Sequence, residues 1–221
     1  MRKALLVFFC CAGCFAAFAQ LPRYPQGYFI NPMSIPMELT ANFGELRNNH
    51  WHMGLDIRTN AKENLPVRAA ASGHIAFIGV RPLSFGRFIV IDHPNGLSTL
   101  YAHLNDFAPA IEQYVTQRQY EQESWAVELR FTPEQFPVRQ GQLIAFSGNT
   151  GGSAGPHLHF EIIDTKSSTR LNPLLFGFPL QDRVAPVIRS LVFYDRSRSM
   201  SNQRPQSIPL RKTATGYEPV S

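Results

Sequence analysis

Two short segments, more than a hundred residues apart, carry histidine and aspartate at spacings that suit metal ligands. The first reads HMGLD at residues 52–56, and the second reads HLH at residues 157–159. A catalytic zinc takes three His, Asp or Glu ligands and keeps a fourth position for water, whereas a structural zinc is closed by four ligands that are usually Cys-rich. All three cysteines lie within the first 14 residues. The two segments therefore predict an open metal site and exclude a Cys-rich structural one.

Each segment suits an extended strand better than a helix. Alternate residues of a strand share a face, so His52, Gly54 and Asp56 would point the same way, and the glycine would leave a slot in which a metal could sit. A glycine in the middle of the segment also disfavours a helix. His157 and His159 likewise share one face, while the apolar residues that alternate with them face the core. The sequence predicts two short strands that present the ligands.

A third feature, besides these two segments, is the isolated histidine His103 in the sequence YAHL. An HxxxD or HxH match by itself arises often by chance, but the three features together resemble the lysostaphin-type, or LytM-domain, zinc metallopeptidases. Members of that family cut peptide bonds in bacterial cell-wall peptidoglycan. The resemblance covers about residues 40–175, and its most specific part is GQLIAFSGNTGGSAGPHLHFEI at residues 141–162.

The resemblance implies a role for five residues. It implies that His52, Asp56 and His159 bind Zn²⁺, and that His103 and His157 flank the water that the metal activates. A neutral imidazole within hydrogen-bond reach of that water can accept its proton, and an imidazolium beside the zinc can stabilise the developing oxyanion. The sequence leaves open how these two roles divide between His103 and His157. Every ligand and catalytic position of the family pattern is occupied.

Four further residues support weaker hypotheses. His50 would share a face with His52, but the HxxxD match favours His52 as the ligand. His74 begins an alternating apolar run and is typical of a surface strand residue, and His93 lies where a hairpin turn is predicted. Glu161 shares the face of His159, so its carboxylate is either a group that orients a ligand imidazole or a solvated side chain.

The remainder of this region predicts a mostly β fold with short antiparallel strands, as in a β-sandwich or a partly open barrel. The clearest turn signal, Pro-Asn-Gly at residues 94–96, predicts a hairpin. Residues 105–137 interrupt the pattern as an insertion, with a short amphipathic helix over 110–125 and a strand over 126–131. Loops of that length are often lids, although an insertion without a functional role is an equal alternative. The other strands are predicted at 67–71, 75–80, 88–92, 98–102, 143–147 and 157–163.

Four segments make up the predicted domain organisation. Residues 1–19 have the basic start, apolar run and A-x-A site of a signal peptide, which places the protein in the periplasm, the cell envelope or the extracellular space. The run is too short for a membrane span, and a lipid anchor at Cys14 is a weaker alternative. Residues 20–40 form a Pro-rich lead-in over the surface of a peptidase domain at 41–180. Residues 181–221 are either the start of a truncated second β domain or a disordered tail.

The net charge of +5 says little about partners, because the surplus is concentrated at the C-terminal end. Residues 181–221 hold seven Lys and Arg against three Asp and Glu, without an aromatic RNA-binding motif or a basic helix, which argues against nucleic acid. Two functions remain. One is a secreted zinc metalloendopeptidase acting on peptidoglycan stem peptides or cross-bridges. The other is a non-enzymatic envelope module that binds peptidoglycan or activates a cell-wall amidase. The complete ligand set favours the first, and either could have protein partners in the cell envelope.

Overall fold

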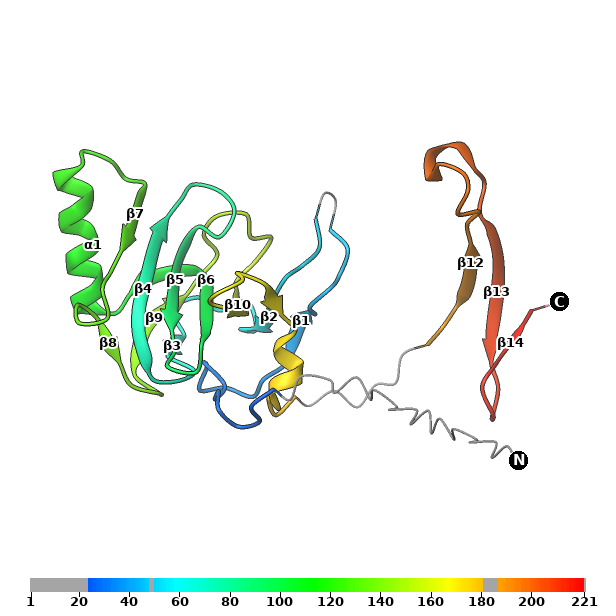
Figure 1. Cartoon of the computed structure of the whole chain (residues 1–221), viewed down its shortest axis with the longest axis horizontal. Coiled ribbons are helices and arrows are strands. Elements are labelled where there is room, and N and C mark those ends of the chain that lie inside the picture. Colours follow the sequence, from blue (N-terminus) through cyan, green and yellow to red (C-terminus); the bar gives the residue numbers. More distant parts are fainter. Residues whose placement is uncertain (1–23, 48–49, 181–186, 221) are drawn as a thin grey trace, which may run out of the picture. The chain divides into compact units, whose positions relative to one another are not determined.

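The computed structural model describes residues 24–47, 50–180 and 187–220. The predicted signal peptide and Cys14 lie outside the described residues. Two compact units make up the chain, residues 1–180 and 181–221, and each is considered separately (Figure 1). Within the described part of the chain, no helix is both long enough and apolar enough to cross a bilayer.

The first unit is an antiparallel β structure with one α-helix, as the sequence predicted. Its main sheet has the order β1-β2-β10-β6-β5-β4-β7, and β3, β8, β9 and β11 pair beside this path. A 3-10 helix, η1, spans Pro173–Phe176. The strands are β1 (Leu39–Ala41), β2 (Leu55–Arg58), β3 (Pro66–Arg68), β4 (Gly73–Val80), β5 (Arg87–Asp92), β6 (Leu97–Phe107), β7 (Val127–Arg130), β8 (Pro137–Val138), β9 (Leu143–Ser147), β10 (His157–Asp164) and β11 (Arg170–Leu171), and the helix is α1 (Pro109–Glu121).

The central position of β10 brings distant parts of the chain together. It pairs with β2 on one side and with β6 on the other, so His159 lies opposite Asp56 and opposite Ala102. These pairings join the two motifs and the YAHL segment in one sheet. The prediction that residues 52–56 form a single strand is wrong in one respect, because β2 begins only at Leu55 and His52 lies in the segment before it.

The lead-in is part of the core, so the prediction that it lies over the domain surface is wrong. Phe29, Met33 and Met37 are all buried against the sheet. Met33 also forms an isolated bridge with Val67 of β3. Burial of these three large apolar side chains, spaced four residues apart, gains more free energy than the ordering of the Pro-rich backbone around them costs.

The predicted helix and strand of residues 105–137 are present as α1 and β7. The helix buries Ile111 and Val115, and β7 pairs with the outer edge of β4. Figure 1 shows α1 at the end of the first unit opposite β1 and β2. This segment therefore extends the sheet at the edge that lies farthest from β2 and β10, the two strands in which the predicted ligand motifs end or begin.

His93 begins the hairpin turn between β5 and β6, as predicted, but its side chain is buried rather than solvated. Its Nδ1 donates to the Ser72 carbonyl at 2.9 Å, and its Nε2 lies 2.8 Å from Thr99 Oγ1. Burial lowers the pKa of His93, and the hydrogen bond to Ser72 only partly opposes this. The folded protein therefore holds His93 as a neutral imidazole.

The lowered pKa of His93 predicts a loss of stability in mild acid. Around and below pH 6.5 the unfolded chain binds more protons at this histidine than the folded chain does, so the free energy of unfolding falls as the pH falls. One such group contributes a slope of up to about 1.4 kcal/mol per pH unit. Chemical denaturation between pH 7.5 and 5 measures it. His93→Gln should have a shallower pH dependence than the wild type, and parallel curves would contradict the assignment.

The second unit forms a three-stranded antiparallel sheet of β12 (Ser190–Phe193), β13 (Gln206–Lys212) and β14 (Tyr217–Pro219). Its described residues thus form strands, as the first of the two alternatives for residues 181–221 expects, and not a disordered tail. A short 3-10 helix, η2, spans Met200–Asn202. Leu191 and Val192 point to opposite faces of β12 and are both exposed. That this sheet begins a second domain remains a prediction.

Candidate metal centre

Three side chains of the first unit converge on one point. His52 Nε2 lies 2.9 Å from Asp56 Oδ1 and 3.0 Å from His159 Nδ1, and His159 Nδ1 lies 2.9 Å from the same carboxylate oxygen. All three residues are buried, and their potential ligand atoms lie within 4.8 Å of one another. Folding therefore brings together the three residues for which the sequence predicted a metal site.

The outer hydrogen bonds of the two imidazoles decide which nitrogen carries a proton. His52 Nδ1 lies 2.7 Å from the Asn42 carbonyl, which can only accept, so this nitrogen donates. His159 Nε2 donates in the same way to Glu161 Oε1 at 3.0 Å. In the neutral tautomers, His52 Nε2 and His159 Nδ1 then turn lone pairs toward each other and toward a carboxylate. Three converging acceptors fit a bound cation, and two imidazoles with one carboxylate are a donor set that zinc favours.

The electrostatics of the cluster agree with a cation site. Burial by itself would raise the pKa of Asp56, but its polar contacts with His157, His159 and His52 outweigh it and hold this pKa well below its usual range. Burial would lower the pKa of His159, yet its hydrogen bonds to Asp56 and Glu161 prevail and raise the pKa to about 9. The cluster thus carries a positive charge in the form of a proton on His159. A metal ion bound at His159 Nδ1 would displace this proton.

Gly54 lies between His52 and Asp56 in the first motif, and the slot that it leaves is filled by a side chain. A Cβ at this position would lie 2.8 Å from Cε1 of the His159 ring and 2.6 Å from the Phe160 carbonyl oxygen. The glycine therefore makes room for the imidazole that comes from β10. The sequence pattern identified an empty space correctly and assigned the wrong occupant to it.

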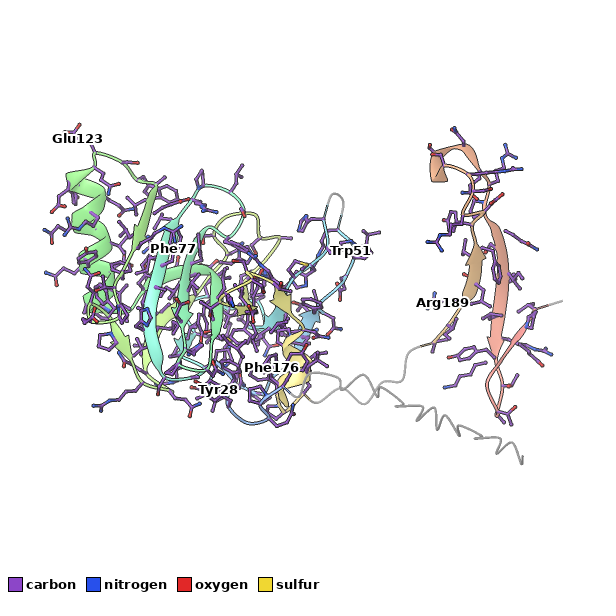
Figure 2. The ribbon with its side chains drawn as sticks, viewed as in Figure 1. Tyr28, Trp51, Phe77, Glu123, Phe176 and Arg189 are labelled. Atoms are coloured by element: carbon purple, nitrogen blue, oxygen red, sulfur yellow. The ribbon has the colours of Figure 1, made fainter. Side chains whose placement is uncertain are left out.

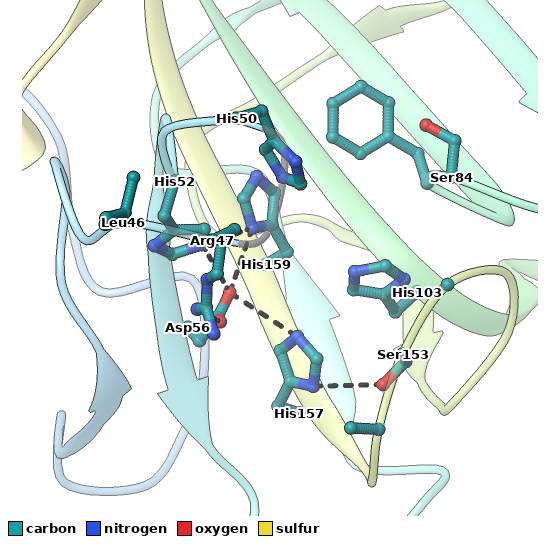
Figure 3. A pocket seen from close by; sticks show the side chains of 13 residues that line it. Leu46, Arg47, His50, His52, Asp56, Ser84, His103, Ser153, His157 and His159 are labelled. Atoms are coloured by element: carbon teal, nitrogen blue, oxygen red, sulfur yellow. Dashed lines mark hydrogen bonds and ion pairs between the residues drawn. The ribbon is translucent and has the colours of Figure 1, made fainter. Parts of the chain in front are cut away.

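His103 and His157 lie beside the cluster with their rings 4.7 Å apart (Figure 3). His103 Nδ1 donates to the Thr150 carbonyl at 2.8 Å, and His157 Nδ1 donates to the Gly155 carbonyl at 2.8 Å. His157 Nε2 lies 3.4 Å from Asp56 Oδ1. Burial, and then the neighbouring His157, lower the pKa of His103 to about 4. His103 is thus a neutral imidazole whose Nε2 is an acceptor.

The backbone at His103 has an unusual conformation. Ala102 and His103 together lie opposite the single residue Phe88, because the register with β5 shifts between Tyr101 and Leu104. His103 has a φ of 60°, in the left-handed region that few residues other than glycine adopt. A β-bulge of this kind re-aims a side chain, and such strain is concentrated at functional sites.

Sequence reasoning missed two arginines that support the cluster. Arg47 Nη2 lies 3.2 Å from Asp56 Oδ2, and Arg170 Nε donates to Glu161 Oε2 at 3.2 Å. Glu161 is buried between Arg170 and His159, so the solvated alternative for this residue is wrong. Neither arginine has a regular spacing from the motifs. Arg170 reaches Glu161 because β11 pairs with β10, whereas Arg47 lies in the segment between β1 and β2, and a single sequence displays neither contact.

A cavity of about 670 Å³ lies over the cluster and is lined by His103, His157 and the three converging residues. A second cavity of about 480 Å³ shares Arg47, Asp56 and His157 with it, and a third of about 460 Å³ shares His52, Phe85 and His159. His50 lines two of these cavities but is not part of the converging cluster. Trp51 projects from the rim of the third cavity (Figure 2). The three cavities form a groove that passes the cluster on both sides.

Comparison with known proteins identifies relatives that are peptidases. Mpg, a DD-carboxypeptidase/endopeptidase from Neisseria meningitidis serogroup B, is 34% identical over 138 residues, which cover 61% of this chain and 26% of that protein. Lysostaphin from Staphylococcus simulans is 26% identical over 159 residues, which cover 71% of this chain and 25% of lysostaphin. The chain spans about a quarter of the length of the curated relatives it matches.

Solved structures show the same fold. The catalytic domain of a mutant of the prophage-encoded M23 protein EnpA from Enterococcus faecalis has a TM-score of 0.50 at 19% identity, with 68% of this chain and 99% of that domain covered. A family model described as Peptidase family M23 matches residues 50–120 and 127–173. These two stretches contain all five histidines and carboxylates predicted for the site. Because the model matches more than half of the sequence, the chain belongs to peptidase family M23.

Proposed function

We propose that the protein is a zinc-dependent endopeptidase that hydrolyses peptide bonds in bacterial peptidoglycan, with His52, Asp56 and His159 as the zinc ligands. The observation that supports this most strongly is the convergence of His52 Nε2, Asp56 Oδ1 and His159 Nδ1 at about hydrogen-bond distance with no fourth protein ligand among the described residues. Relatives such as Mpg and lysostaphin support peptidoglycan as the substrate class. Export from the cytoplasm is part of the same proposal.

When bound, zinc supplies a Lewis acid that polarises the scissile carbonyl and lowers the pKa of water to near 7. The residues of the chain supply proton transfer and orientation. His103 donates through Nδ1 to Thr150, so its Nε2 is free to accept the proton of the attacking water. His157 lies on the same side of the cavity, and its Nε2 is near an anionic oxygen of Asp56. This favours His157 as the donor that stabilises the carbonyl oxygen as it becomes negative.

The open groove supports cleavage within a peptide rather than at its end. Cavities continue on both sides of the ligand cluster, one toward Arg58 and Pro156 and the other toward Trp51 and Arg170. A substrate can therefore place residues on each side of the scissile bond.

Metal removal tests the proposed function. The zinc-loaded protein should reduce the turbidity of purified sacculi and release products in which a peptide bond has been hydrolysed and the glycan is intact, as shown by mass spectrometry. Treatment with a chelator should abolish the activity, and added zinc should restore it. His103→Ala prepared in parallel controls for contaminating hydrolases. One zinc per chain with intact sacculi and intact defined cross-linked muropeptides would contradict the proposal and favour a non-enzymatic binding module.

A further inference from the structure

One side of the central cavity is formed by residues 81–86, which connect β4 and β5 and are called the wall loop below. Ser84 and Phe85 of this loop line the cavity. The backbone N–H of His103 donates to the Phe85 carbonyl at 3.0 Å, and the centroid of the Phe85 ring lies 5.5 Å from the centroid of the His159 ring. A movement of the wall loop would therefore displace His103 and remove a packing contact from His159.

Arg87, the first residue of β5, fastens the end of the wall loop to the segment that orients His103. Its backbone N–H donates to Thr150 Oγ1 at 3.0 Å, and the Thr150 carbonyl accepts His103 Nδ1 at 2.8 Å. The two backbones touch, because a Cβ at Gly86 would lie 2.5 Å from the Thr150 carbonyl carbon. The position of Arg87 thus determines how the wall loop and Thr150 fit together.

The guanidinium of Arg87 extends away from the cavity toward α1. It lies over the Phe107 ring at 4.5 Å and pairs with Glu112 in the first turn of the helix. The backbone N–H of Phe107 donates to the same Glu112 oxygen at 2.9 Å. Only 11% of the Arg87 side chain is exposed, and Glu112 is its one acidic partner among the described residues. This buried charge therefore depends on the helix.

We propose that α1 braces the wall loop through the Glu112–Arg87 ion pair, and that both residues position His103 for catalysis. The inference rests on the proposed peptidase function. No residue of 105–137 lines the three cavities, so the helix supports the site from behind and does not act as a lid. Removing one partner of a buried ion pair leaves a costly unpaired charge. The freed guanidinium would turn toward water and pull on Gly86 and Thr150.

Glu112→Ala tests this brace against Glu121→Ala, which removes a surface ion pair with Arg118 on the same helix. A displacement of about 1 Å at a catalytic group lowers turnover by about 100-fold, so we expect Glu112→Ala to lose about 10- to 100-fold in kcat. KM and the zinc content should change little. Glu121→Ala should match the wild type. Glu112→Gln should recover most of the activity, because its amide oxygen can still accept from Phe107 and Arg87.

A purely structural role predicts a different result, namely a lower Tm with unchanged kcat at temperatures where the variant is folded. That result would overturn the proposal. If Glu112→Ala does not fold, Arg87→Lys carries the test, and an unchanged kcat in that variant would overturn the proposal equally. NMR of the metal-free protein separates the brace from the proposed function. The His103 ring signals should shift in Glu112→Ala and not in Glu121→Ala, even if the wild type cleaves no peptidoglycan, and unshifted signals would contradict the brace.

Discussion

His159→Ala is expected to lose zinc and, with it, all measurable peptide hydrolysis. The variant removes one of the three converging side chains and leaves only His52 and Asp56 of the three proposed ligands. Changes in groups that merely orient a ligand already cost about 10- to 100-fold in metal affinity, so the loss of a ligand should exceed about 100-fold. Metal content after dialysis and the cleavage rate of defined muropeptides measure the two effects.

His74→Ala provides the matched control for this experiment. His74 lies on β4 and lines none of the three cavities over the cluster, so its removal should leave zinc content and activity unchanged. Circular dichroism would establish that both variants keep the β fold. Retention of one zinc per chain in His159→Ala would show that the ligand assignment is wrong.

His103→Ala is expected to separate metal binding from turnover. His103 is not among the three converging residues, so the variant should keep a full complement of zinc. It would lose the imidazole that we propose accepts the proton of the attacking water, and such a group contributes about 10²- to 10⁴-fold to the rate. We therefore expect kcat to fall by that factor while KM changes little.

His50→Ala is the corresponding control for His103→Ala. His50 also lines the central cavity, but it lies outside the ligand cluster and has no proposed part in proton transfer. Its removal should cost no more than a few-fold in kcat/KM. Wild-type turnover in His103→Ala, or loss of zinc from that variant, would each contradict the role given to His103.

The local elements of the first unit could be predicted well from the sequence. The strand over residues 143–147 coincides with β9, and the apolar alternation after His157 marks β10 to within one residue. The Pro-Asn-Gly turn marks the hairpin between β5 and β6. Alternation and turn residues record local conformation directly, so these elements required no knowledge of the rest of the chain.

Long-range pairing is what the sequence did not show. His159 lies opposite Asp56 because of the register between β10 and β2, and neither motif by itself encodes that register. The polar residues Asn105 and Asp106 hid the continuation of β6 to Phe107, and the bulge at His103 has no composition signal. The predicted strand over 67–71 ends at Arg68, because Ala69 to Ala71 are buried without strand pairing.

A zinc-loaded crystal with anomalous diffraction measured at the zinc edge tests the ligand assignment most directly. We predict a single strong anomalous peak in the first unit, about 2.0–2.2 Å from His52 Nε2, Asp56 Oδ1 and His159 Nδ1, with no further protein ligand. His103 and His157 should lie near this peak without bonding to it. A peak elsewhere in the unit, or a fourth protein side chain that closes the coordination sphere, would contradict an open catalytic zinc site.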